Sequence, residues 1–353
     1  MSRLLVCTGG GEPPYSSNQG VIDGLRSLGH EVVSIGPRYW DRCLCDIEVP
    51  DSKFPEYYSY EEILTLAPWQ PDLIVQCEPH FYLSGKKPPE IISCNLVLDP
   101  HRGAVAFRRL AEEGSFNVVF CMQKYFMPLF QDIRGARTEF LAQAFNQVRF
   151  EPDRDGPIVC DIAMVGQTGI ANMEYPHEDE TGKFAIRPPI NLPTDHTRFT
   201  FWQHFGFDYA ERAEILIRLC KDFNVRIYGG VYDERYQLAL QRGAMSVHRS
   251  LLNDVTIRCF ETMAANRLLI CDDIPYQEEL FQDGIHCRTY RTYGFKPFFE
   301  NFTAEYNQIY KLVKYHLDHQ REMEAISREG HRLAWEKHSW RSRAQELLNV
   351  VFN

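Results

Sequence analysis

The stretch "RCFETMAANRLLICDD", residues 258–273, carries two side chains that suit the binding of a polar ligand. Arg258 can bind an anion through two parallel hydrogen bonds, and an ionised Glu261 can accept hydrogen bonds from hydroxyl groups. The apolar spacing around them predicts a helix, with Asn266 as its left-handed terminator and a buried strand at residues 268–271. The alternative is a surface ion pair between the two charges, three positions apart, worth about 0.2–0.5 kcal/mol.

The residues just before this stretch can form the N-terminus of the same helix. Either Asn253 or Asp254 can cap it, and its first free N–H groups, around Val255 and Thr256, would suit a diphosphate. His248 lies in the same lead-in, "MSVHRSLLNDVTI". The sequence therefore predicts an anion-binding site here.

A second candidate site is the glycine-rich stretch "CTGGGEPPYSSNQG" near the start of the chain. Gly10 and Gly11 allow close backbone approach between an expected strand and an expected helix. The stretch is neither the dinucleotide fingerprint nor a P-loop, because it lacks both spacings. A substrate-facing loop is the functional hypothesis, with a plain strand-to-helix turn as the alternative.

A third candidate is His101 in "LVLDPHRGAVAF", where an expected strand ends before an expected helix. Histidine exchanges a proton near neutral pH, so this side chain could donate a hydrogen bond or carry a proton in a cleft. The alternative is an ordinary turn in which Asp99 caps the helix.

Strand-like and helix-like stretches alternate along most of the chain, which predicts parallel sheets covered by helices. "EPDRDGP", residues 151–157, has the composition of a linker between two such domains. The expected divisions are 1–152, 153–330 and a closing helix at 331–353. Residues 173–206, rich in proline and aromatic side chains, predict a long loop over the cleft between the domains, with a surface elaboration as the alternative.

Length and composition limit the classes of protein that fit. The 353 residues exceed one hydrophobic core, and 44% hydrophobic content can fill two. A net charge of -10 is a poor match for a nucleic-acid backbone. Several of the eleven cysteines lie in apolar strand-like runs, which predicts buried free thiols, a reducing compartment and therefore the cytoplasm. No run of residues reaches the length of a membrane span, and no zinc-type cysteine pairing occurs.

The motif around Arg258 resembles the nucleotide-sugar-binding segment of GT-B glycosyltransferases of the group 1 type, in the spore-maturation-protein-like branch. The similarity rests on an R-x-F-E-x-M-A helix followed by E-L-F-x-D-G, carried here by Arg258, Phe260, Glu261, Met263, Ala264, Glu279, Leu280, Phe281, Asp283 and Gly284. "CDIAMVGQTG", containing Gly166, and "VRIYGGVYDE", containing Gly229 and Gly230, resemble earlier strand–glycine turns of the second domain in that family.

This resemblance implies two Rossmann-like, doubly wound domains that face each other across a cleft. The first domain would bind an acceptor and the second a nucleotide sugar, with UDP favoured as the nucleotide. Glu261 would bind the ribose hydroxyls, and Arg258 the diphosphate. His101, Asn253 and Asp254 would be the catalytic candidates, and the glycines, His248, Val255 and Thr256 would line the donor site. This interpretation requires no metal and no other cofactor, since arginine and helix amides can stabilise the charge of the diphosphate.

Asn253 departs from the pattern, because many retaining relatives carry a glutamate at that position. Asn253 or Asp254 could replace it beside the sugar, and retention of configuration is the outcome that the resemblance favours. The alternatives are a glycosyltransferase-like sugar-binding or inactive protein, and a glycosyltransferase that acts on modified nucleic-acid bases. A dehydrogenase is disfavoured by the missing dinucleotide fingerprint.

Overall fold

The structure is a computed structural model, and it divides the chain into two units. It describes residues 1–9, 16–37, 45–49, 56–77, 81–98, 104–166, 207–228, 231, 235–250, 254–292 and 298–353. Unit 1 comprises Met1–Arg149 and Lys337–Asn353, and unit 2 comprises Phe150–Glu336. The predicted boundary between the domains was residue 152, with a closing helix at 331–353. In the structure the chain returns to unit 1 at Lys337.

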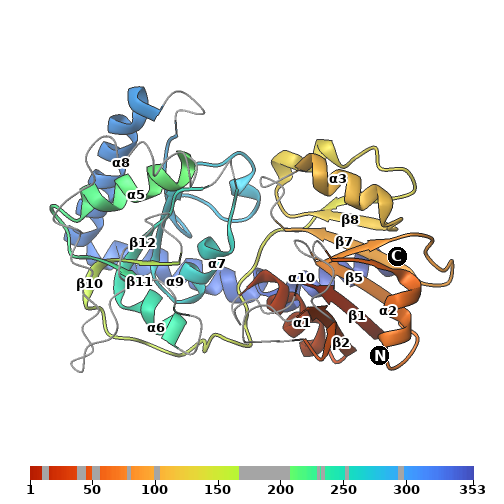
Figure 1. Ribbon diagram of the computed structural model, residues 1–353. Coiled ribbons are helices and arrows are strands. Elements are labelled where there is room, and N and C mark those ends of the chain that lie inside the picture. The colour runs from red at the N-terminus through yellow and green to blue at the C-terminus, as the bar shows by residue number, and fades with distance from the viewer. Residues whose placement is uncertain are drawn as a thin grey trace. The chain divides into compact units, whose positions relative to one another are not determined.

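Unit 1 is built on a sheet of seven parallel strands in the order β3-β2-β1-β5-β7-β8-β9 (Figure 1). Their bounds are β1 Arg3–Thr8, β2 Glu31–Pro37, β3 Ile47–Val49, β5 Leu73–Cys77, β7 Ile92–Val97, β8 Val118–Cys121 and β9 Arg137–Phe140. Leu4 of β1 pairs with Val32 on one side and with Leu73 on the other. The strand order reverses between β1 and β5, and that reversal is where such sheets bind ligands, beyond the carboxyl ends of the strands.

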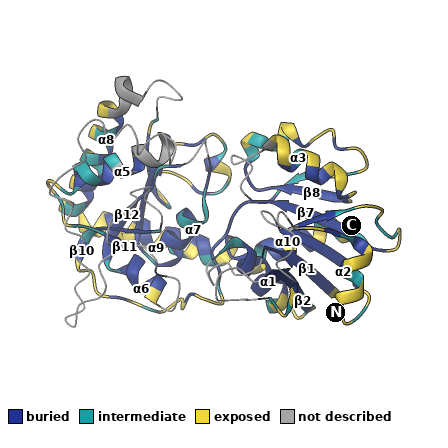
Figure 2. Ribbon diagram, in the orientation of Figure 1, coloured by how far each residue is buried: buried dark blue, intermediate teal, exposed yellow. Residues whose placement is uncertain are grey.

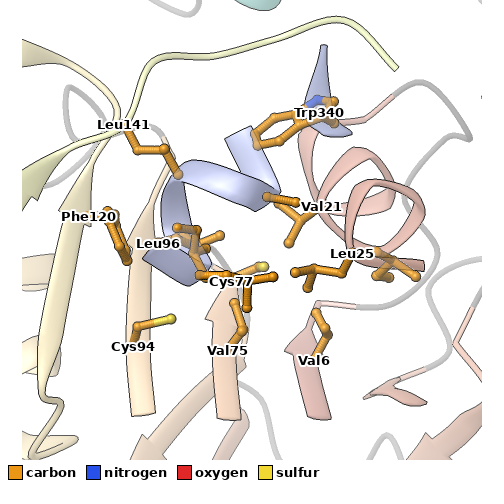
Figure 3. Close-up of a cluster of buried hydrophobic side chains, with 14 of the residues drawn as sticks. Val6, Val21, Leu25, Val75, Cys77, Cys94, Leu96, Phe120, Leu141 and Trp340 are labelled. Carbon is orange, nitrogen blue, oxygen red and sulfur yellow. The ribbon is translucent and has the colours of Figure 1, made fainter. Parts of the chain in front are cut away.

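Helices cover both faces of this sheet. They are α1 Ser17–Ser27, α2 Tyr60–Leu66, α3 Ala104–Glu113, the short helix η2 Lys124–Leu129 and α10 Trp340–Phe352; β4 Glu56–Ser59 and β6 Phe81–Ser84 form a small parallel pair beside them. Side chains of α1 and α10 pack with Val6, Val75 and Leu96 on one face (Figure 3). Figure 2 shows the strands dark blue and much of α2 and α3 yellow, so these helices have one buried and one exposed side.

The last helix, α10, lies against the first, α1, because α1 has glycines at the contact. A Cβ added to Gly20 would lie 2.1 Å from the Trp340 ring, and one added to Gly24 would lie 2.4 Å from the Trp340 carbonyl oxygen. Trp340 itself is 1% exposed. The end of the chain therefore completes the core of unit 1.

Unit 2 contains a sheet of five parallel strands in the order β11-β10-β12-β13-β14. The bounds are β10 Cys160–Val165, β11 Val225–Tyr228, β12 Gly243–Val247, β13 Leu268–Asp272 and β14 Arg288–Tyr290; the helices are α5 Phe207–Leu219, α6 Arg235–Gln241, α7 Ile257–Ala264, η3 Gln277–Glu279, α8 Phe298–Asp318 and α9 Gln320–Lys337. Its strand order reverses between β10 and β12. The predicted α/β class, with two doubly wound parallel sheets, is confirmed.

Several local predictions are also confirmed. Gly29 follows α1 with a φ of 83°, and Asn266 follows α7 with a φ of 57°, so both end their helices in the left-handed conformation. The cysteines expected in strands are buried and free, namely Cys7, Cys77, Cys94, Cys121, Cys160 and Cys271.

Candidate functional site

Two candidate residues leave the sheet of unit 2 side by side at its carboxyl edge. Gly166 follows β10 and His248 follows β12, and these strands are parallel neighbours with Ile162 opposite Met245. They flank the point where the strand order reverses. The sheet thus places Gly166 and His248 where a ligand of this architecture binds.

Arg258 lies directly against Gly166. A Cβ added to Gly166 would be 2.2 Å from a terminal nitrogen of the Arg258 guanidinium. Gly166 also has a φ of 109°, which side chains other than hydrogen rarely allow. The Arg258 Nε atom is buried and has no hydrogen-bond partner among the described residues. Gly166 therefore makes room for a guanidinium whose hydrogen-bonding capacity is only partly used.

The N-terminus of α7 begins later than the sequence predicted. The N-cap is Thr256, with extended backbone, and the helix starts at Ile257. Asp254 is therefore not the cap, and Arg258 lies in the first turn of the helix. Thr256 Oγ1 lies 3.2 Å from His248 Nε2 and makes no capping hydrogen bond. This tertiary contact explains why the local capping rule failed.

Three arginines act electrostatically on His248, which is fully buried. Burial lowers the pKa of His248 well below its usual value, and Arg212, Arg258 and Arg249 lower it further. The imidazole is therefore neutral at physiological pH, and the local positive charge comes from guanidinium groups. Such a cluster favours an anion.

Arg212 is a member of this cluster that the sequence analysis missed. Its Nη2 donates a hydrogen bond of 2.8 Å to the backbone oxygen of Arg249, and the residue is 5% exposed. Arg212, Ile215, Leu216 and Leu219 share one face of α5, because they follow the i, i+3, i+4, i+7 pattern. An arginine at a core position of an amphipathic helix is the sequence signal that could have identified Arg212.

Glu261 lies one helical turn beyond Arg258 and is 1% exposed. Its Oε2 accepts a hydrogen bond of 2.6 Å from the Tyr236 hydroxyl. Burial raises the Glu261 pKa to about 7, while Tyr236 and Arg258 act in the opposite direction. The alternative of a surface ion pair is therefore wrong, because the carboxyl group is buried and bonds to Tyr236.

The first of the two aspartates that end the opening motif, Asp272, positions the segment after His248. Its carboxylate accepts hydrogen bonds from the Ser250 backbone and hydroxyl, and it pairs with Arg249 at 3.1 Å. Glu305 of α8 lies 3.7 Å from the same guanidinium. Asp272 therefore has a structural task, which is to hold Arg249 and Ser250 in place after β12.

The structure describes some of the predicted site residues and leaves others outside the described ranges. Gly166, His248, Thr256 and Arg258 come together, Glu261 follows on the same helix, and Asp254 and Val255 are buried just before it. The remaining candidates lie outside the described residues: Gly10, Gly11, His101, Gly229, Gly230, Asn253 and the segment 173–206.

Within the described ranges, histidine, cysteine, aspartate and glutamate side chains form no group of three that could bind a metal ion. In the same ranges, no helix has both the length and the apolar character required to cross a membrane.

Comparisons with known proteins agree with this architecture. Residues 196–349 match the family model described as glycosyl transferase-like. No curated protein sequence matches the chain. The similarity to this family covers residues 196–349, which contain α7 with Arg258 and Glu261.

Solved structures are similar over the whole chain. Alr3699/HepE from Anabaena, in complex with UDP and glucose, has a TM-score of 0.58 at 11% identity, with 100% of both chains covered. An alpha-glucosyltransferase in complex with UDP and DNA has a TM-score of 0.60 at 10% identity, again over 100% of both chains. Sucrose-phosphate synthase from Thermosynechococcus elongatus has 0.53 at 12%, over 99% and 98%. These similarities show that the chain has the GT-B type of fold.

Proposed function

We propose that the protein is a glycosyltransferase that moves a sugar from a nucleotide-sugar donor, bound by unit 2, to a hydroxyl acceptor, bound by unit 1. The contact between Arg258 and Gly166 beside the N-terminus of α7 carries this proposal. It supplies a guanidinium and unpaired helix amides at the carboxyl edge of the sheet, which suit a diphosphate. A UDP-sugar is the proposed donor, since HepE has been crystallised with UDP-glucose. The similarity of the motif to the spore-maturation-protein-like branch supports the same reaction.

In the proposed reaction, the acceptor oxygen forms a bond to the anomeric carbon while the bond from that carbon to the diphosphate breaks. The nucleoside diphosphate leaves with the electron pair, and its departing oxygen takes up the proton that the acceptor hydroxyl loses. Arg258 and the α7 amides would stabilise the charge that develops on the diphosphate, so the proposal requires no metal. His101, Asn253 and Asp254 are the proposed catalytic residues beside the sugar, with retention of configuration as the proposed outcome.

In this proposal, Glu261 binds the ribose hydroxyls. The carboxylate lies on α7, one turn from Arg258, and an ionised carboxylate has two acceptor oxygens. Tyr236 already donates to Oε2, which leaves Oε1 and the remaining lone pairs for the ribose. The proposed location in the cell is the cytoplasm, because a reducing compartment suits the buried free thiols.

The test is to compare UDP and uridine binding by calorimetry in wild-type protein and in Arg258→Ala. We expect the variant to weaken UDP binding by about 10- to 100-fold, the effect of losing hydrogen bonds to a charged group. Uridine affinity should change by less than about twofold, since uridine has no phosphate. Arg332→Ala is the matched control, because Arg332 is exposed on α9 and pairs with Glu329 and Glu336. Equal losses of affinity for UDP and uridine would contradict the assignment of Arg258 to the diphosphate site.

A sugar-binding protein without transferase activity is the second candidate, and the asparagine at position 253 favours it. Slow hydrolysis of a UDP-sugar in the absence of acceptor distinguishes the two. A transferase should release UDP and lose this reaction in Glu261→Ala, whereas a sugar-binding protein should bind the donor without cleaving it.

A further inference from the structure

The ribose candidate Glu261 is hydrogen-bonded to a residue of another helix. Tyr236 lies on α6 and Glu261 on α7 (Figure 1). The Tyr236 hydroxyl donates a hydrogen bond of 2.6 Å to Glu261 Oε2, and the two residues are 7% and 1% exposed. They are 25 positions apart in the chain. This buried bond therefore joins two elements of unit 2 at the carboxyl group.

Tyr236 is itself fixed in place by the residues that open unit 2. The ring of Phe150, the first residue of that unit, meets the Tyr236 ring edge to face, with the ring centroids 6.3 Å apart. The next residue of α6, Gln237, accepts a hydrogen bond of 2.9 Å from the Glu151 amide and donates one of 2.7 Å to the Glu151 carbonyl. Phe150, Tyr236 and Gln237 are all buried. The Tyr236 hydroxyl thus occupies a defined position.

The hydrogen bond acts on both the orientation and the charge of the carboxyl group. With Oε2 bonded to the phenol, Oε1 is the oxygen turned away from Tyr236. A phenol bonds more strongly to a carboxylate than to a neutral carboxyl group, so the bond favours the ionised form. Burial has the opposite effect and raises the pKa of Glu261 to about 7. Tyr236 therefore offsets part of the cost of a buried charge.

Titratable side chains on α7 and α9 bear on the same carboxyl group to different extents. Arg258, one turn earlier on α7, favours the ionised form of Glu261. His331 of α9 contacts α7 further along, with its Nδ1 atom 2.9 Å from the Ala264 carbonyl oxygen. Burial lowers the pKa of His331 below its usual value of 6.5, so this side chain is uncharged from pH 7 upward. Arg258 and His331 thus keep constant charges between pH 7 and pH 8.5, while Glu261 titrates.

Packing alone explains neither member of this hydrogen-bonded pair. A phenylalanine ring would fill the same space beside Phe150 without a hydroxyl group. A buried carboxyl group opposes folding unless it is paired, and an apolar pair of the same shape would avoid that cost. A costly ionisable group of this kind is typical of a site where the carboxylate has a task of its own.

We propose that Tyr236 is a positioning residue of the donor site, which keeps the Glu261 carboxyl group ionised and with Oε1 turned toward the ribose. This role rests on the proposed function, because that function assigns the ribose hydroxyls to Glu261. It goes beyond that function, since the phenol then sets the pH range in which the donor binds. Without the hydroxyl, Glu261 would be mostly protonated at pH 7, and donor binding would require a higher pH.

Calorimetry of UDP-glucose binding at pH 7 and pH 8.5 tests this role in the wild type and in Tyr236→Phe. We expect the Kd of the variant to be about fivefold higher at pH 7, because loss of the bond moves the midpoint of the Glu261 titration up by about one pH unit. At pH 8.5 the difference should shrink to about twofold or less, because Glu261 is then mostly ionised in both proteins. An equal loss of affinity at both pH values, or no loss at pH 7, would overturn the proposal.

Tyr315→Phe is the matched control. Tyr315 donates a hydrogen bond of 2.8 Å to Glu322 Oε2, so this variant also loses a bond from a tyrosine to a carboxylate, but at an exposed place on α8. Its UDP-glucose affinity should equal that of the wild type at both pH values. Tyr236→Phe keeps the ring that packs on Phe150, so the variant should fold, and thermal unfolding at both pH values checks this.

A double variant tests whether Tyr236 acts through Glu261. In the Glu261→Gln background, Tyr236→Phe should change UDP-glucose affinity by the same factor at both pH values, because no carboxyl group titrates at this position. A loss that still shrinks at pH 8.5 would overturn the proposal, since the pH dependence would then belong to another group.

A titration without ligand separates this role from the proposed function. NMR can follow the side-chain carboxyl carbon of Glu261 in protein labelled with carbon-13 glutamate, and the absence of this signal in Glu261→Gln identifies it. We expect the midpoint to lie about one pH unit higher in Tyr236→Phe. If the midpoint moves but the wild type does not bind UDP-glucose, the donor assignment fails and the control of Glu261 ionisation by Tyr236 stands. If UDP-glucose binds and the midpoint is unchanged, the role of Tyr236 fails while the donor assignment stands.

Discussion

Glu261 is a carboxyl group whose surroundings oppose its ionisation. It is buried, and burial raises its pKa to about 7, close to physiological pH. Tyr236 donates a hydrogen bond to it, which favours the charged form and limits the shift. A small change in pH near neutrality therefore changes the charge of this side chain.

This pKa predicts that donor binding strengthens with pH. Only the ionised Glu261 offers the full set of acceptors to the ribose hydroxyls, so UDP-glucose affinity should rise by about tenfold between pH 6 and pH 8. UDP-glucose is the probe because its diphosphate is a diester without a proton that titrates in this range. Calorimetry at pH 6, 7 and 8 measures the change, and Glu261→Gln should bind more weakly and show a flat profile. An equally steep profile in Glu261→Gln would assign the pH dependence to another group.

Stability provides a control for the same titration. The folded-state pKa lies above the unfolded value of 4.5, so the neutral carboxyl favours the folded state and stability is lost as pH rises from about 4.5 to 7. Above pH 7 the full penalty applies, at most about 3 kcal/mol for a shift of this size. Glu261→Gln avoids it, so its advantage in free energy of unfolding over the wild type should grow across that window.

At the scale of the element, α7 is fixed at both ends by tertiary contacts. At its start, Thr256 contacts His248 at 3.2 Å. At its end, the Ala264 carbonyl lies 2.9 Å from His331 Nδ1 and accepts a hydrogen bond of 3.2 Å from Trp335, both on α9. The contacts at the Ala264 carbonyl satisfy a backbone group that a helix end leaves unpaired. They also set where Arg258 and Glu261 lie, so the helix presents both side chains in a defined position.

The contact of α7 with the turn after β10 predicts the effect of Gly166→Ala. The added Cβ would occupy the place of an Arg258 guanidinium nitrogen, 2.2 Å away, and the φ of 109° would be strained. We expect a loss of about 1–3 kcal/mol in stability and a loss of UDP affinity comparable to that of Arg258→Ala. Titration calorimetry and thermal unfolding measure the two effects.

Gly284→Ala is the matched control for this variant. Gly284 has a φ of 74°, but nothing lies within 4 Å of the added Cβ. It should cost about 1–2 kcal/mol of stability and leave UDP affinity unchanged. If Gly166→Ala binds UDP as tightly as Gly284→Ala does, the contact between Gly166 and Arg258 does not shape the donor site.

Local sequence patterns predicted the helices and strands well, but they predicted the contacts between these elements poorly. Apolar runs and glycine or asparagine terminators identified the strands and the ends of α1 and α7, because these depend on neighbouring residues. The start of α7 was predicted wrongly, because Thr256 contacts His248 from another element. Arg212 was missed for the same reason, since its partner is the backbone of Arg249, 37 positions away. The arginine cluster is a product of sheet topology, which local patterns do not encode.

At the scale of the whole molecule, net charge bears on the alternative that the acceptor is a nucleic-acid base. One solved structure of similar fold contains DNA, but this chain carries a net charge of -10. A negatively charged protein attracts a phosphate backbone only weakly, because only the few arginines at one site can neutralise phosphate charges. We expect fluorescence anisotropy to show no binding of a short DNA duplex tighter than about 100 μM at ~150 mM salt. Tight binding that weakens steeply with salt would restore the alternative.

The C-terminal helix links the two ends of the chain in one folding unit. Phe145 makes backbone hydrogen bonds with His338 and Trp340. These bonds join the two parts of the chain that form unit 1, near the end of the first part and the start of the second. Beyond that point, α10 buries Trp340, Ala344, Leu347 and Leu348 against α1 and the seven-stranded sheet. Unit 1 therefore lacks part of its core until the whole of unit 2 has been synthesised.

A chain that ends at Lys337 should consequently lose the structure of unit 1 and retain that of unit 2. Each large apolar side chain removed from the core contributes about 1.5–3 kcal/mol, and together they approach the total stability of a typical domain. Hydrogen–deuterium exchange with peptide resolution should show rapid exchange in β1, β5 and β7 and continued protection in β10, β12 and β13. Leu347→Ala should weaken unit 1 by about 2–5 kcal/mol, whereas Gln345→Ala, on the exposed side of α10, should change little. Equal protection of β1 in the truncated and full-length chains would mean that the first 149 residues fold without α10.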